Sequence, residues 1–184
     1  MPKLLLFFIF FSLLAAAGLP LKGQGLYRAN QGQLSFKSDA PLELIEAVSK
    51  SLRGVIDPAK RTFAFSVPVN TFQGFNSPLQ REHFNENYME TAVYQEATFS
   101  GKIIEDIDLS VPGTYSVRAK GKLNVHGIEQ ERIIKSTVES KENVLIVRSD
   151  FTVLLAEHNI SIPRIVYQKI AEEIQVHVEA TFSR

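Results

Sequence analysis

Apolar and polar residues alternate with a period of two in three well-separated stretches of this chain. From Thr62 the sequence reads TFAFSVPVN, which places Phe63, Phe65 and Val67 on one side of an extended strand. The same alternation returns at residues 115–120 and 174–183. Because successive side chains of a strand point to opposite faces, each stretch has one apolar face. Several such strands must bury these faces together, in a β-sandwich or a closed barrel.

The remaining turn and strand signals bring the expected number of strands to about eight. Further strands are predicted at residues 26–37, 97–104, 130–138 and 143–155, and the stretch at 115–120 belongs to a strand predicted at 113–125. Eight strands close into a barrel that is just wide enough for side chains or one small ligand. The predicted fold class is therefore mainly all-β, an antiparallel eight-stranded β-barrel with two or three short helices.

Residues 76–90 are the best helix candidate in the chain. Ser77 can cap the helix, Pro78 takes its first position, and Gln80 stands at capping-box spacing from Ser77. We also expect a short helix at 164–173.

Three further expectations concern individual segments of the predicted fold. In the helix at 164–173, Ile165, Val166 and Ile170 are expected on the inner side. Residues 38–54 fit either a helix or a strand followed by a turn. Pro68 predicts an edge, a bulge or the end of the strand that begins at Thr62.

The first 25 residues have the layout of a secretory signal peptide. Lys3 precedes an uncharged apolar run from Leu4 to Ala17, and small residues with a turn follow it. The run is shorter than the roughly 18–20 residues that span a bilayer, so cleavage between Ala17 and Gly25 is favoured over a membrane anchor. The predicted domains are a signal peptide at 1–25 and one barrel domain at 26–184.

Composition narrows the classes of function and the compartment. The chain has 20 basic and 20 acidic residues, and this neutral balance gives no electrostatic case for nucleic-acid binding. It has no cysteine, which excludes disulfides, thiolate chemistry and cysteine-based metal sites. An exported chain without disulfides favours a periplasmic or secreted bacterial protein.

Three stretches resemble the signatures of the YceI-like family. They are HFNENYME at 83–90 with YQEATFSGKI at 94–103, GKLNVHGI at 121–128, and FTVLL at 151–155 with NISIP at 159–163. Their order and spacing cover nearly the whole chain after the signal peptide. The resemblance implies an exported lipocalin-like antiparallel barrel that buries a long isoprenoid, quinone-like or fatty-acyl ligand.

The chain departs from related patterns in three places. Gln95 stands where the family usually has a proline, and the segment before Gly54 is less easily matched. The chain has no tryptophan, so the Gly-x-Trp signature of true lipocalins is absent and the likeness to lipocalins is one of shape.

The apolar side chains predicted to face inward form the candidate ligand-binding wall. They are Phe63, Phe65, Val67, Phe72, Phe75, Phe84, Tyr88, Met89, Phe99, Tyr115, Val117, Leu123, Phe151 and Val153. The competing interpretation is a solid core, since small barrels bury many aromatic side chains without any ligand. The family resemblance favours a tunnel.

Neither the histidines nor the acidic residues predict catalysis or metal binding. No histidine pair has helical metal-site spacing, and His126 is expected to hydrogen-bond loop backbone. His83 is expected to pair on the surface with Glu86 or Glu90, and His177 to face solvent. The acidic run at 105–108 lacks the glycine and distal glutamate of a calcium loop, so a solvated turn is expected. No Gly-x-Ser-x-Gly elbow and no phosphate-binding glycine loop occurs.

These observations favour a non-catalytic carrier without a cofactor, whose partner is a long apolar small molecule. The segment 76–90 and the loop after it are expected to gate the barrel. Transient membrane contact and a homodimer formed through edge strands are further expectations. Two alternatives stay open at this point: an enzyme that modifies such a lipid in the same barrel, and a solid-core structural or interaction module.

Overall fold

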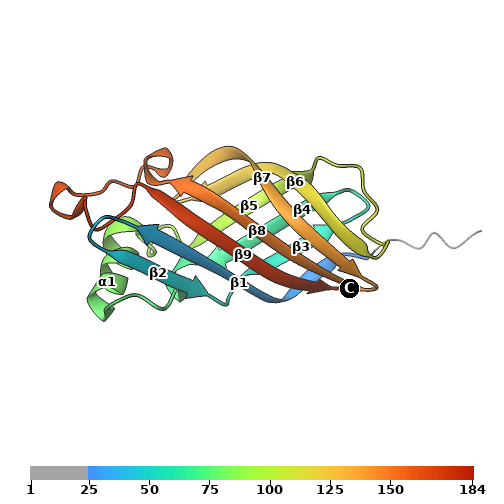
Figure 1. Cartoon of the computed structure of the whole chain (residues 1–184), viewed down its shortest axis with the longest axis horizontal. Coiled ribbons are helices and arrows are strands. Elements are labelled where there is room, and N and C mark those ends of the chain that lie inside the picture. Colours follow the sequence, from blue (N-terminus) through green and yellow to red (C-terminus); the bar gives the residue numbers. More distant parts are fainter. Residues whose placement is uncertain (1–24) are drawn as a thin grey trace, which may run out of the picture.

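The described part of the chain, residues 25–184 of a computed structural model, contains nine antiparallel strands arranged as one closed barrel (Figure 1). The strands are β1 (Tyr27–Asp39), β2 (Leu44–Ser49), β3 (Arg53–Asp57), β4 (Thr62–Pro68), β5 (Glu96–Ile103), β6 (Gly113–Val125), β7 (Ile128–Lys141), β8 (Val144–Leu154) and β9 (Glu173–Ser183). Strands β2 and β3 both pair with β1, each strand from β3 to β8 pairs with the one that follows it, and pairing between β1 and β9 closes the barrel.

The nine strands occupy eight positions because β2 and β3 are two parts of one interrupted strand. Strand β2 pairs with the second half of β1, from Leu34 onward, and β3 pairs with Tyr27 and Arg28 at its start. The predicted eight-stranded antiparallel barrel is thus confirmed, and residues 38–54 follow the strand alternative. The outer edge of β2 makes one isolated bridge, between Val48 and Gln73, and the homodimer through an edge strand stays a prediction.

The helical elements gather at one end of the barrel. They are the α-helix α1 (Pro78–His83), a π-helical turn η2 (Phe84–Tyr88), and the 3₁₀ turns η1 (Val69–Thr71), η3 (Leu155–His158) and η4 (Arg164–Val166). We call this end, with the β1–β2 loop (residues 40–43) and residues 155–172, the mouth. The C-terminus and the start of β1 lie at the opposite, closed end (Figure 1).

The start of α1 is capped as its sequence predicts. The Ser77 hydroxyl accepts the backbone N–H of Gln80 at 3.1 Å. The Gln80 side chain accepts the N–H of Asn76 at 3.0 Å, one residue before the expected capping-box partner. The regular helix is shorter than predicted, because the π-helical turn η2 replaces it from Phe84 to Tyr88.

The predicted helix at 164–173 is wrong. Only the 3₁₀ turn η4 forms there, and Ile165 points into solvent instead of inward. Two bonds of this segment reach other parts of the chain: the carbonyl of Gln168 accepts the N–H of Leu42 at 2.9 Å, and the Ala171 N–H donates to the hydroxyl of Ser38 in β1. These two backbone groups are not available for a helical ladder.

Large side chains fill the closed end. Tyr27, Leu145 and Phe182 are fully buried there. Phe182 meets the ring of Phe65 edge-on, with 5.5 Å between centroids. A β-carbon on Gly54 would lie only 3.0 Å from both rings, so a larger residue at this position would have to displace them. The barrel is therefore solid at this end.

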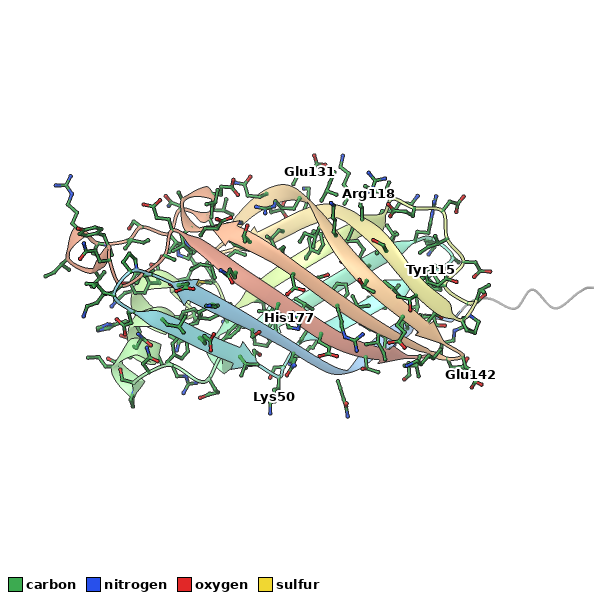
Figure 2. All side chains as sticks on the ribbon, in the orientation of Figure 1. Lys50, Tyr115, Arg118, Glu131, Glu142 and His177 are labelled. Carbon is green, nitrogen blue, oxygen red and sulfur yellow. The ribbon has the colours of Figure 1, made fainter. Side chains whose placement is uncertain are left out.

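The outer face of the barrel is charged. Lys120 pairs with Glu131 and Lys122 with Glu129 across β6 and β7, and Figure 2 shows Glu131 and Arg118 on this surface. The backbone N–H of Arg118, and then its guanidinium, hold the pKa of the Glu105 carboxyl down at about 2.

Two points concern membranes and the N-terminus. Among residues 25–184, no helix combines the length and apolar character needed to cross a bilayer. Apart from Gly25, the predicted signal peptide lies outside the described residues.

Candidate functional site

The barrel interior contains two adjacent chambers. The outer chamber has a volume of about 480 Å³ and opens at the mouth, where α1 and the loop at 166–170 contribute to its wall. The inner chamber, of about 100 Å³, lies deeper in the barrel. Five side chains belong to both walls and define the neck: Leu34, Val67, Ala97, Leu123 and Phe151. The outer chamber alone falls in the size range of small-molecule sites.

All the predicted wall residues except Tyr115 line a chamber. Phe63, Phe65, Phe99 and Val117 surround the inner chamber, Val67, Leu123 and Phe151 form part of the neck, and Phe72, Phe75, Phe84, Tyr88, Met89 and Val153 line the outer chamber. Their inward direction follows from strand alternation in the barrel, and from α1, η1 and η2 lying across its mouth.

Tyr115 is the correction to this set. It lies near the start of β6, toward the closed end (Figure 2). Its hydroxyl donates to the carbonyl of Val111 at 2.9 Å, and its partly buried side chain packs against the hydrophobic core. Tyr115 lines neither chamber.

Sequence reasoning missed an aromatic residue at the centre of the outer chamber wall. Phe36 of β1 stacks on Phe84, with 5.4 Å between ring centroids and 18° between planes, and lies 5.2 Å from Phe72. Phe75 completes this cluster. Phe36 lies in the strand predicted at residues 26–37, and its alternation with Leu34 was a signal that could have placed it in the wall.

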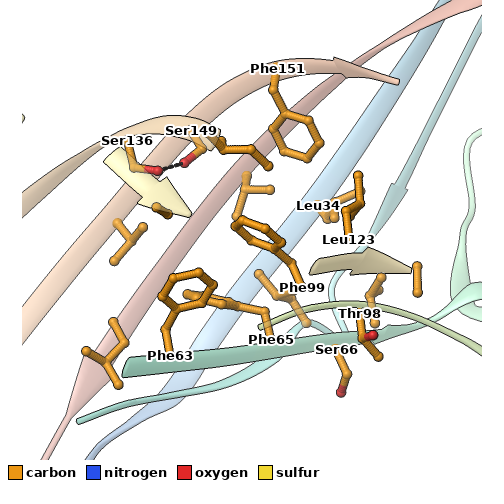
Figure 3. Close-up of a pocket in the computed structure, with 18 of the residues that line it drawn as sticks. Leu34, Phe63, Phe65, Ser66, Thr98, Phe99, Leu123, Ser136, Ser149 and Phe151 are labelled. Atoms are coloured by element: carbon orange, nitrogen blue, oxygen red, sulfur yellow. Dashed lines mark hydrogen bonds between the residues drawn. The ribbon is translucent and has the colours of Figure 1, made fainter. Parts of the chain in front are cut away.

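Four hydroxyl-bearing residues line the inner chamber, Ser66, Thr98, Ser136 and Ser149, and two of them form a pair. The Oγ atoms of Ser136 and Ser149 lie 2.5 Å apart, across β7 and β8 (Figure 3). One hydroxyl donates to the other, so the pair satisfies part of its own hydrogen-bonding capacity. Phe151 and Phe99 lie beside this pair in the same chamber (Figure 3).

Polar and charged side chains otherwise collect around the mouth. Glu43 accepts the amide groups of Gln80, at 2.9 Å, and of Asn76, at 3.3 Å. Lys169 and His83 also line the outer chamber. Burial raises the pKa of the Tyr88 hydroxyl above its ordinary value. The site thus has an apolar depth and a polar entrance.

A histidine clasp holds the segment after η2 against the β6–β7 turn. His126 Nε2 lies 2.7 Å from Glu90 Oε2, and its Nδ1 lies 3.1 Å from the carbonyl oxygen of His158. The ring of Tyr94 packs on His126 and against Gly127, where a β-carbon would collide with it. The predicted bond of His126 to loop backbone is confirmed, and the clasp lines neither chamber.

The other histidine and acidic residues singled out in the sequence lie outside the chambers or at the mouth. The predicted pairing of His83 with Glu86 or Glu90 is wrong: among residues 25–184 no hydrogen bond or ion pair joins them, and Glu90 bonds to His126 instead. His177 Nδ1 lies 2.7 Å from Asp150 on the outer surface (Figure 2). The acidic run at 105–108 forms a turn in which Asp106 pairs with Arg61 and Asp108 accepts bonds from Ser110. Within residues 25–184, no group of three histidine or acidic side chains is arranged to hold a metal ion.

The family model for the YceI-like domain matches residues 29–182. The chain belongs to the YceI-like family. The stretches that suggested it meet at the mouth of this YceI-like barrel: 83–90 covers the outer chamber, His126 bonds to Glu90, and residues 151–160 contribute Phe151, Val153, Leu155 and Ile160 to the wall.

Solved structures share the fold of this YceI-like chain at low sequence identity. A polyisoprenoid-binding domain from Saccharophagus degradans is 15% identical with a TM-score of 0.72, and the match covers 85% of this chain and 97% of that one. BcnA of Burkholderia cenocepacia is 17% identical with a TM-score of 0.68, covering 82% and 95%. The YCEI protein of Campylobacter jejuni is 11% identical with a TM-score of 0.57, covering 74% and 82%. Among curated proteins, none matches this chain.

Proposed function

We propose that this YceI-like barrel is a non-catalytic carrier that buries one long apolar molecule, an isoprenoid, a quinone-like lipid or a fatty-acyl chain. The observation that supports the proposal is the outer chamber of about 480 Å³, which opens at the mouth and shares the neck residues with the inner chamber. The apolar part of the ligand enters first, and its polar end stays near Glu43, Gln80 and Lys169 at the entrance.

Burial alone can supply the affinity. Each methylene removed from water contributes about 0.8 kcal/mol, so ten methylenes contribute roughly 8 kcal/mol before the costs of association. The neighbour from Saccharophagus degradans is described as polyisoprenoid-binding, and we extend that ligand class to this chain as part of the proposal.

Two pairs of polar side chains in and near the chambers support a carrier more than an enzyme, because the members of each pair bond to one another. Glu90 and His126 bond to each other in the clasp, outside both chambers. The hydroxyls of Ser136 and Ser149 also bond to each other. With its signal-like N-terminus, the proposed carrier works in the periplasm or outside a bacterial cell.

Lipid extraction tests the proposal directly. Protein purified from its native host is extracted with organic solvent and analysed by mass spectrometry, beside an unrelated exported protein purified in the same way. We expect one class of apolar molecule that the control protein lacks. In parallel, the delipidated protein should bind cis-parinaric acid, a fluorescent acyl chain, or the polyisoprenoid alcohol solanesol. An empty extract together with no binding of either probe contradicts the proposal.

A further inference from the structure

Large apolar side chains stand in solvent around the mouth of the barrel. Ile165 is 91% exposed, Leu42 66%, Tyr167 63% and Leu79 57%. They come from three separate segments: the β1–β2 loop, α1 and the loop between β8 and β9. Exposed apolar side chains gathered at one site mark an interaction surface.

The three segments form one continuous edge. Leu42 donates its N–H to Gln168 at 2.9 Å, which joins the β1–β2 loop to the loop of Ile165 and Tyr167. Glu43, next in the chain, accepts the side-chain amide of Gln80 in α1 at 2.9 Å. Leu79, Val166 and Ile170 also line the outer chamber. The exposed edge is therefore the lip of the cavity itself.

The tip of this edge is basic. Arg164 and Lys169 flank Ile165 and Tyr167, both are exposed, and neither has an acidic partner within residues 25–184. Acidic residues follow only at the base of the loop, as Glu172 and Glu173 at the start of β9. Glu43 is held by two amide groups. We call Leu42, Leu79, Arg164, Ile165, Tyr167 and Lys169 the docking rim.

We propose that the docking rim binds the surface of an anionic lipid bilayer, with Ile165, Leu42 and Leu79 in the interface. Aliphatic, tyrosine and basic side chains together suit the boundary between acyl chains and negatively charged headgroups. A bilayer covers the rim and the mouth at once, so an apolar chain passes between membrane and outer chamber without exposing its methylenes to water. This transfer role, though not the docking itself, rests on the proposed carrier function.

The absence of tryptophan makes the test direct, because one introduced tryptophan reports on its own surroundings. Ile165→Trp places the reporter on the rim. Ile133→Trp is the matched control, since Ile133 is also exposed, at 56%, on β7. With vesicles of phosphatidylethanolamine and phosphatidylglycerol, we expect a blue shift and quenching by brominated acyl chains at position 165, and neither effect at position 133.

A charge variant tests the basic tip. Arg164→Gln with Lys169→Gln should weaken binding to the anionic vesicles roughly fivefold per charge. It should leave the weaker binding to phosphatidylcholine vesicles unchanged. Circular dichroism and thermal unfolding verify that each variant is folded.

The outcomes separate docking from ligand binding. No shift at position 165, an equal shift at position 133, or no effect of the charge variant overturns membrane docking. The binding of cis-parinaric acid without vesicles is measured on the same variants. If Ile165→Trp binds this probe normally but ignores vesicles, docking is wrong and the carrier function stands. If vesicles shift the emission while wild-type protein binds no apolar probe, the rim docks and the carrier function fails.

Discussion

At the scale of single residues, the hydroxyls of Ser136 and Ser149 are the unusual feature of an apolar chamber. Their Oγ atoms lie 2.5 Å apart, and Ser149 is buried. Removing one hydroxyl leaves the other without this partner in the chamber, whereas removing both leaves nothing unpaired. We expect Ser136→Ala or Ser149→Ala alone to lower the free energy of unfolding by about 1–3 kcal/mol, and the double variant to lie near wild type.

Urea unfolding of the two single variants and the double variant measures their free energies of unfolding, and the double-mutant cycle then gives the interaction free energy between the two hydroxyls. Ser116→Ala on β6 is the control, because that serine is exposed and its loss should change stability little. Additive losses in the double variant would mean that the two hydroxyls do not depend on each other.

At the scale of elements, the segment from η2 to β5 depends on the histidine clasp. Both ring nitrogens of His126 face acceptors, the carboxylate of Glu90 and the carbonyl of His158. Backbone bonds inside the segment, such as Thr91 N–H to Asn85 O at 2.8 Å, are local and short-range. We expect Glu90→Ala to loosen the segment, with amide hydrogen exchange at residues 89–94 about tenfold faster, because a hydrogen bond to a charged group is lost.

Hydrogen exchange followed by mass spectrometry or NMR measures this effect. Glu86→Ala is the matched control, since Glu86 lies in the same segment with an exposed side chain. If the segment is the gate of the barrel, release of cis-parinaric acid also speeds up in Glu90→Ala and not in Glu86→Ala. Unchanged exchange in Glu90→Ala would show that the clasp does not hold the segment.

At the scale of the whole molecule, the neck decides how much of a ligand the barrel takes in. Ala97 is the smallest side chain of the neck and lines both chambers. Ala97→Phe should close the passage to the inner chamber. Exclusion of about three methylenes at roughly 0.8 kcal/mol each weakens binding of a long acyl chain about 50-fold. A chain short enough to end before the neck should bind as it does to wild type.

Ala64→Phe provides the control for this experiment. Ala64 lies on the adjacent strand β4 with its side chain in solvent, so the same added volume leaves the neck open. Fluorescence titration with cis-parinaric acid measures both variants. Equal affinity in Ala97→Phe and Ala64→Phe would show that the ligand does not pass the neck.

The pattern of neighbouring residues was sufficient to predict much of this fold. The alternation in residues 62–70 placed Phe63, Phe65 and Val67 on the inner side, because the direction of a side chain in a strand depends on its own backbone. The Ser77 cap was predictable for the same reason, since the bond to Gln80 joins residues three positions apart. The choice of strand over helix for residues 38–54 could not be predicted locally. It depends on pairing with β1 and not on the segment itself.

The sequence by itself determined a barrel of about eight antiparallel strands, its aromatic interior and its family, because period, turn chemistry and motif order are properties of neighbouring residues. Only the tertiary structure decided that the barrel is solid beside Tyr27 and Phe182 and hollow beneath Phe84, and that Tyr115 lies outside the cavity. It also decided that Ile165 stands in solvent beside the mouth. These outcomes depend on which distant segments meet. The physical reason is that the filling of the barrel, the walls of its cavity and the exposure of a side chain are set by contacts between chain segments and not within them.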